Sequence, residues 1–241
     1  MPPTLRKVSQ YGGKLSPADV AEGINASRRN AKRLADDAAF MLEAKRLPSA
    51  LALAILSIEE SGKAGILRAI GMASTDAELK QYWKEYRSHK SKNALWAAFD
   101  YIAKGARKLD DFAGLFDPNE DHPQVLDELK QLAVYTECVR VGRWVEPTSV
   151  AEQPLVESIV TIASTFATEK MVSAEELEIY FRHLGPVRES NPGWIQQAFV
   201  NAYAEMQRRG VKPPGSNEAE DLVKGLISAH EGRKVDKDRQ S

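Results

Sequence analysis

Several features are scarce in this chain of 241 residues. It has one cysteine, Cys138, so it cannot form an internal disulfide, and no basic segment followed by an apolar one opens it. No uncharged apolar run approaches the roughly 18 residues that a membrane span needs. We therefore expect a cytoplasmic protein that does not cross a membrane. An excess of one charge is also missing, since 33 Lys+Arg face 34 Asp+Glu. This balance argues against wholesale coating of nucleic acid but leaves room for a local basic patch.

Helix signals recur along the whole chain, whereas no convincing strand pair or internal repeat is present. Ser16 is placed to cap a helix that starts at Pro17 and runs to about Lys45. A second helix is expected from Pro48 to about Gly71, and capping boxes begin two more, Thr75 with Glu78 and Ser173 with Glu176. The helix after Thr75 should reach about Lys104, and further helices are expected near 107–116, 122–138, 150–170, 173–184, 194–209 and 218–230. The sequence therefore predicts an all-α fold.

One stretch interrupts the helical pattern near the middle of the chain. The run from Val139 to Pro147 is expected to be extended or looped, and it is the best domain boundary. We therefore expect four parts, namely an N-terminal extension (1–16), a helical bundle (17–147), a C-terminal helical region (148–212), and a linker, short helix and disordered tail (213–241).

Two adjacent carboxylates lie in the apolar second helix. Glu59 and Glu60 both fall in helical rows that are otherwise core, and Lys63 is their nearest local partner. A buried carboxylate needs a cation or several donors. Either a buried salt bridge that fixes helix register or a functional site explains the pair. A strip of small residues on the same helix would let another helix approach closely: Ala54, Ser57, Ser61 and Gly65.

The third helix carries aromatic rings, a histidine and lysines together. From Leu79 to Lys108 there are eight Lys or Arg against two acidic residues, a basic patch that the overall charge conceals. Aromatic rings can stack on bases, a histidine can transfer protons near neutral pH, and lysines can hold phosphate. The combination would suit RNA, although a single histidine among aromatics is more often a hydrogen-bonded packing residue. The candidate RNA-binding residues are Trp83, Tyr86, Lys90, Lys92 and Asn93, with His89 among them.

Other kinds of catalytic site find no support. The chain has no histidine and cysteine cluster with zinc spacing, no glycine-rich loop after a strand, and no Gly-x-Ser-x-Gly. We therefore expect neither a metal nor a cofactor.

Four blocks of the sequence together resemble one family. They are residues 25–42, residues 50–64 with Glu-Glu-Ser-Gly-Lys, residues 83–92 with Arg-x-His-x-x-Lys, and residues 130–137 followed by Trp144-Val-Glu-Pro. In combination they look like the HEPN domain of AbiV-type abortive infection proteins, over about residues 17 to 150.

This resemblance implies a HEPN helical bundle, often dimeric, with a role against phage. Many HEPN proteins are metal-independent ribonucleases that use an arginine and a histidine four to six positions apart. Here Arg87 and His89 are two apart, about 200° around an unbroken helix, and Lys84 stands five before His89. If RNA is cleaved, the resemblance implies His89 as general acid or base and Arg87 or Lys92 as phosphate clamp. Glu59 or Glu60 would orient them, with Lys63 within hydrogen-bonding range.

Three hypotheses follow. The first is an antiphage protein, expected to be a homodimer, that acts on RNA or the translation machinery as a metal-independent endoribonuclease. The alternative is a non-catalytic HEPN module that binds a phage or host protein, with a structural Glu/Lys/His cluster. The third is a helical regulatory protein that dimerises through the small-residue strip. A solvent-open cluster favours the first, and a dry, closed one favours the second.

Overall fold

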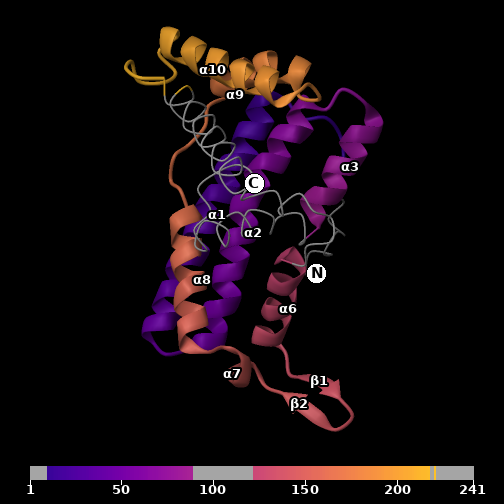
Figure 1. Ribbon diagram of the computed structural model, residues 1–241, viewed down its shortest axis with the longest axis vertical. Coiled ribbons are helices and arrows are strands. Elements are labelled where there is room, and N and C mark those ends of the chain that lie inside the picture. The colour runs from indigo at the N-terminus through magenta and orange to yellow at the C-terminus, as the bar shows by residue number, and fades with distance from the viewer. Residues whose placement is uncertain (1–9, 89–121, 218–219, 221–241) are drawn as a thin grey trace, which may run out of the picture.

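The computed structural model describes residues 10–88, 122–217 and 220, and the structural statements below concern these residues. They form an almost wholly helical assembly with one small hairpin, which confirms the all-α prediction (Figure 1). The elements are α1 (Pro17–Glu43), α2 (Leu47–Met72), α3 (Asp76–Arg87), α6 (His122–Val134), β1 (Glu137–Arg140), β2 (Arg143–Val145), α7 (Pro147–Val150), α8 (Gln153–Phe166), α9 (Ala174–Leu184), η2 (Gly185–Val187) and α10 (Pro192–Arg208). None of these helices combines the length and the apolar character needed to cross a membrane.

The long helices α1 and α2 lie side by side at the centre (Figure 1). As predicted, Ser16 caps α1, and it forms a capping box with Asp19. The hydroxyl of Ser57 donates to the carbonyl oxygen of Ala31 at 2.7 Å, and both residues are buried. Small side chains at this crossing let the two backbones approach. Part of the small-residue strip therefore packs within the chain, where the third hypothesis expected a dimer interface.

The helices α8 and α6 complete the lower half of the bundle (Figure 1). Their buried side chains, among them Leu126 and Ile159, join Leu51, Ile55 and Ile58 of α2 in one core. Burying each such side chain contributes roughly 1.5–3 kcal/mol. Helix α8 lies beyond residue 147, yet it belongs to this core and continues the bundle.

The helices α9 and α10 lie across the other end of the α1–α2 pair (Figure 1). They share a second core around Ile179 and Ala202. A Cβ atom at Gly71 of α2 would collide with the ring of Phe181. Glycine is therefore what lets α9 approach α2 at this point.

The structure corrects three expectations about helix ends. Helix α3 ends at Arg87 instead of reaching Lys104, because Ser88 has extended backbone angles (φ −82°, ψ 132°) that do not continue the helix. Helix α6 ends at Val134, since the chain then enters the antiparallel β1–β2 hairpin, which the sequence did not indicate as a strand pair. The helix expected over 150–170 is shorter, since α8 begins at Gln153, with Pro154 in its first turn, and ends at Phe166; the separate short helix α7 precedes it and ends at Val150. The helices expected at 107–116 and 218–230 lie outside the described residues.

The capping box expected at the start of α9 is only half formed. Ser173 accepts the Glu176 N–H at 3.0 Å, as expected. The Glu176 carboxylate instead pairs with Lys212 at 3.0 Å. A distant cation has thus taken the side chain that would have closed the box.

The start of α3 is held by Glu78, which completes the predicted capping box with Thr75. Its carboxylate accepts the Ser74 N–H at 2.7 Å and pairs with Arg188 at 2.8 Å. The Ser74 N–H and the Arg188 guanidinium lower the pKa of Glu78 to about 2. Ionised Glu78 therefore ties α3 to the segment after α9.

We expect the stability difference between the wild type and Glu78→Gln to depend on pH. The folded-state pKa is depressed, so the stabilisation is complete above pH 4.5 and is lost as the pH falls toward 2. Urea unfolding midpoints measured from pH 7 to pH 2 should show the wild-type advantage narrowing between pH 4.5 and 2. An advantage that stays constant down to pH 2 would contradict this assignment.

Candidate functional site

The two adjacent carboxylates of α2 make separate contacts. Glu59 is only 3% exposed and accepts a hydrogen bond from Lys130 Nζ of α6 at 2.6 Å. Glu60 is half-buried and pairs with Lys63 of its own helix at 2.5 Å. Neighbouring residues on a helix point about 100° apart, which explains the different partners. Glu59 therefore links α2 to α6, whereas Glu60 stays on α2.

Lys130 is buried between two carboxylates. It is 7% exposed, and its Nζ also lies 2.9 Å from Asp127 Oδ1, one turn earlier on α6. Burial acts to lower the pKa of Lys130, but the carboxylates of Glu59 and Asp127 outweigh it and hold the pKa above its usual value. The buried cation of Lys130 is thus compensated by two carboxylates. This buried and compensated arrangement is the one expected of a structural salt bridge.

The partly exposed half of the acidic cluster connects α2 to α3. Lys63 Nζ lies 5.3 Å from the centre of the Tyr86 ring, within range of a cation–π contact. The structure thus brings Glu60 and Lys63 of the predicted catalytic cluster together beside Tyr86. Glu59 is beside Glu60 in sequence but faces the core.

Arg87 takes a different direction from the predicted cluster. Its guanidinium lies 5.1 Å from the Trp83 ring centre and donates to the carbonyl oxygens of Tyr11 and Trp83. Among the described residues it bonds neither Glu59 nor Glu60. The contacts with the segment before α1 hold it at the outer end of α3.

Trp83 packs inside the protein, although the sequence analysis placed it among the RNA-binding residues. It is 8% exposed, and its indole N–H donates to the Gly13 carbonyl oxygen at 2.9 Å. Tyr11 and Tyr86 meet it edge-on, with ring centres 6.0 and 5.4 Å away. At this low exposure the ring offers little surface on which a base could stack. The remaining candidates, His89, Lys90, Lys92 and Asn93, lie outside the described residues.

Exposed cations follow one side of α3. Lys80, Lys84 and Arg87, which we call the basic edge of α3, line a shallow hollow of about 660 Å³. Lys14 lines a neighbouring hollow together with Lys80 and Arg87. Within the described part of the chain, none of the three edge residues forms an ion pair. The described residues also contain no group of three His, Cys, Asp or Glu that could hold a metal ion.

Lys130, the partner of Glu59, is not among the site residues predicted from the sequence. A signal for it exists, because Lys130 stands among Leu126, Leu129 and Ala133 at helical spacing. A lysine in such an apolar row requires a buried carboxylate. Glu59 of α2 and Lys130 of α6 carry opposite charges, and each lies in an otherwise apolar row. This combination indicates that α2 and α6 pack against each other.

Comparison with known families gives one match. The family model described as AbiV, a HEPN family, matches residues 19–168. No curated protein and no solved structure matches the chain. The matched region runs from α1 through α8, and it leaves α9 and α10 outside. Because the match covers more than half of the chain, the chain belongs to the AbiV family of HEPN domains, which associates it with abortive infection.

Proposed function

We propose that the protein acts in abortive infection by binding RNA along the basic edge of α3. The observation that carries this proposal is the row of exposed cations at Lys80, Lys84 and Arg87, none of them ion-paired with a described residue. The spacing of four and three residues puts the cations on one helix face, about 6 Å and about 4.5 Å apart along the axis. Such a row suits the successive phosphates of a strand.

We assign different roles to the two adjacent carboxylates of α2. Glu59 is closed off by Lys130, so we assign it to holding α2 against α6. The accessible polar groups are Glu60 and Lys63, beside Tyr86. RNA binding is therefore the proposed function. We further propose that the bound RNA is cleaved, with His89 as general acid or base.

We expect Lys80→Gln/Lys84→Gln to bind single-stranded RNA more weakly than the wild type. Each lysine that neutralises a phosphate contributes about 0.7 to the slope of log affinity against log salt concentration for single strands. The double variant should flatten that slope by about 1.4. Fluorescence anisotropy with a labelled RNA oligonucleotide, repeated over a series of salt concentrations, measures both effects.

A matched control removes the same charge far from α3. Lys45 and Arg46 are exposed in the turn between α1 and α2, at the opposite end of the bundle (Figure 1). Lys45→Gln/Arg46→Gln should keep the wild-type salt slope. If the control lost as much RNA affinity and salt slope, RNA binding would depend on the overall charge of the protein and not on this surface. An unchanged slope in Lys80→Gln/Lys84→Gln would refute the proposed interface.

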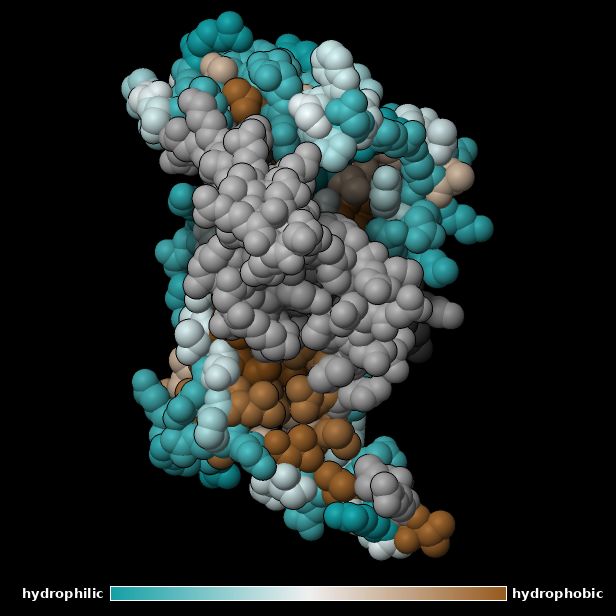
Figure 2. Space-filling view, viewed as in Figure 1, coloured by the Kyte–Doolittle hydropathy of each residue, from teal (hydrophilic) through white to brown (hydrophobic). Residues whose placement is uncertain are grey.

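The alternative function is that of a module that binds a phage or host protein. It is favoured by apolar side chains in and beside the β1–β2 hairpin, where Tyr135 is 61% and Trp144 is 67% exposed. Figure 2 shows further apolar residues gathered on the lower part of this face, over α2 and α6. Clusters of this kind mark protein-binding surfaces. Failure of the wild type to bind RNA even at low salt would favour this alternative.

A further inference from the structure

A pocket lies where α9 and α10 cross the end of α2, away from the acidic pair and the basic edge. Its volume is about 490 Å³, within the range of pockets that hold small molecules. Helices α9 and α10 lie outside the region that matches the AbiV family. The pocket is therefore built from α2, inside the matched region, and from α9 and α10, beyond it.

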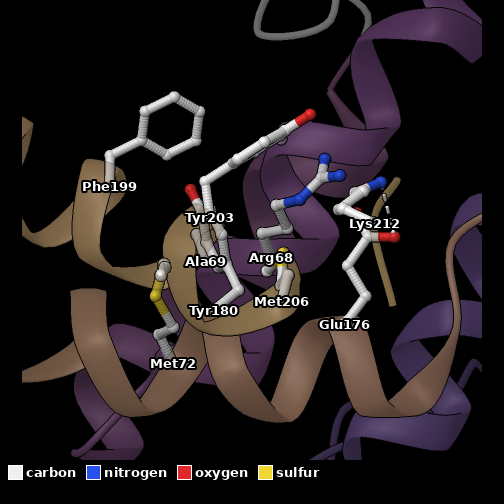
Figure 3. A pocket seen from close by; sticks show the side chains of 11 residues that line it. Arg68, Ala69, Met72, Glu176, Tyr180, Phe199, Tyr203, Met206 and Lys212 are labelled. Atoms are coloured by element: carbon white, nitrogen blue, oxygen red, sulfur yellow. Dashed lines mark hydrogen bonds and ion pairs between the residues drawn. The ribbon is translucent and has the colours of Figure 1, made fainter. Parts of the chain in front are cut away.

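Aromatic and thioether side chains form the bulky apolar part of the wall. Tyr180 comes from α9, Phe199 and Tyr203 come from α10, and Met72 comes from α2. Figure 3 shows these side chains around the same space, from helices that are far apart in the sequence. Flat rings and flexible thioethers suit a planar apolar group.

Arg68 brings a positive charge into this apolar wall. Its guanidinium lies 5.7 Å from the Tyr180 ring centre, and Nη1 donates to its own helix at the Ala64 carbonyl oxygen at 3.3 Å. It forms no ion pair with any described carboxylate. A guanidinium that is stacked on a ring and lacks a carboxylate keeps donors for an anion.

The charges of the two other charged residues that line the pocket, Lys212 and Glu176, cancel each other. Lys212 Nζ pairs with Glu176 at 3.0 Å, and Figure 3 shows the Arg68 guanidinium between this pair and the Tyr203 ring in that view. One positive charge, that of Arg68, is thus left over among the lining residues. Burial, and then the charge of Arg68, lower the pKa of nearby Arg28, while Glu176 acts against this. The surroundings of the pocket therefore favour an anion.

We infer that this pocket binds a small planar aromatic anion, with the ring against Tyr180 and Tyr203 and the anionic group on Arg68. A phosphate on a nucleoside and a carboxylate on an aromatic ring supply the same chemistry. A neutral ring would form no ion pair with Arg68, and a bare anion would make no contact with the aromatic side chains of the wall. Both parts of the ligand are therefore needed.

Isothermal titration calorimetry of the full chain with four probes tests this inference. Adenosine 5′-monophosphate and indole-3-acetate carry a ring and an anion, adenosine carries the ring alone, and inorganic phosphate carries the anion alone. At least one of the first two should bind at least tenfold more tightly than the last two. Which of them binds more tightly identifies the anionic group as phosphate or carboxylate. Absence of binding by both up to millimolar concentration would overturn the inference.

Two variants link the binding to the pocket. Arg68→Met should weaken binding about ten- to a hundredfold, as expected for loss of a charged hydrogen bond. A Cβ atom at Gly65, which lines the pocket on α2, meets nothing within 4 Å. Gly65→Leu should therefore block the pocket while the helix, which gains from losing glycine, stays folded.

The control is Arg46→Met, which removes an exposed arginine just before the other end of the same helix. It should bind the probe as the wild type does. Wild-type affinity in both Arg68→Met and Gly65→Leu would place any bound probe elsewhere and overturn the inference.

Discussion

Replacing Lys130 with methionine is expected to lower the free energy of unfolding by about 3–5 kcal/mol. The substitution keeps the length of the side chain but removes the cation that lies 2.6 Å from buried Glu59. The carboxylate would then be buried without compensation, at 3% exposure, or would have to take up a proton. Urea unfolding at pH 7, followed by circular dichroism, measures the loss.

Two further variants separate the buried pair from ordinary charge effects. Glu59→Leu/Lys130→Met should regain most of the lost stability, because both charges of a buried pair can be replaced by apolar groups at little cost. Lys63→Met removes the partner of half-buried Glu60 and should cost less than Lys130→Met. A loss below about 1 kcal/mol in Lys130→Met would mean that water reaches Glu59.

The stabilisation that Lys130 contributes should be lost at alkaline pH. The carboxylates of Glu59 and Asp127 hold the pKa of Lys130 above its usual 10.5 against the opposing effect of burial. For a raised lysine pKa, the stabilisation is complete below the unfolded value and is lost as the pH rises through the folded one. The contribution of Lys130 is therefore constant through the neutral range.

Local signals in the sequence located the starts of helices well. Ser16 and Thr75 cap α1 and α3 because a capping box involves only residues three positions apart, so the sequence contains the whole interaction. The end of α3 was not found, because Ser88 carries no strong stop signal. The β1–β2 hairpin was missed since its strands are four and three residues long, too short for an alternating pattern to stand out.

Contacts between distant segments could not be read from spacing. Lys63 was identified as the local partner of the acidic pair, and it does bond Glu60, whereas Glu59 finds Lys130, 71 residues away. Arg87 likewise bonds the backbone of Tyr11, 76 residues earlier. Which of two adjacent carboxylates faces the core depends on where the next helix packs, and only the fold decides that.

Trp83→Ala is expected to cost about 3–5 kcal/mol of stability, because it empties a buried site and removes the indole N–H bond to Gly13. Trp83→Phe keeps most of the packing and should cost less. Trp144→Ala is the control, since that tryptophan is 67% exposed and its loss should change stability by no more than about 0.5 kcal/mol. Thermal and urea unfolding of the three variants provide the comparison.

RNA affinity of the same variants distinguishes packing from base stacking at Trp83. Stacking of a base on an aromatic side chain contributes about 1–3 kcal/mol, so a stacking role predicts a roughly ten- to hundredfold loss in Trp83→Ala. A packing role predicts an affinity within about twofold of the wild type, measured well below the unfolding midpoint of the variant. We expect the second result, because both neighbouring tyrosines and the Arg87 guanidinium already surround the ring. A large loss of affinity in a folded Trp83→Ala would instead mean that this end of α3 opens when RNA binds.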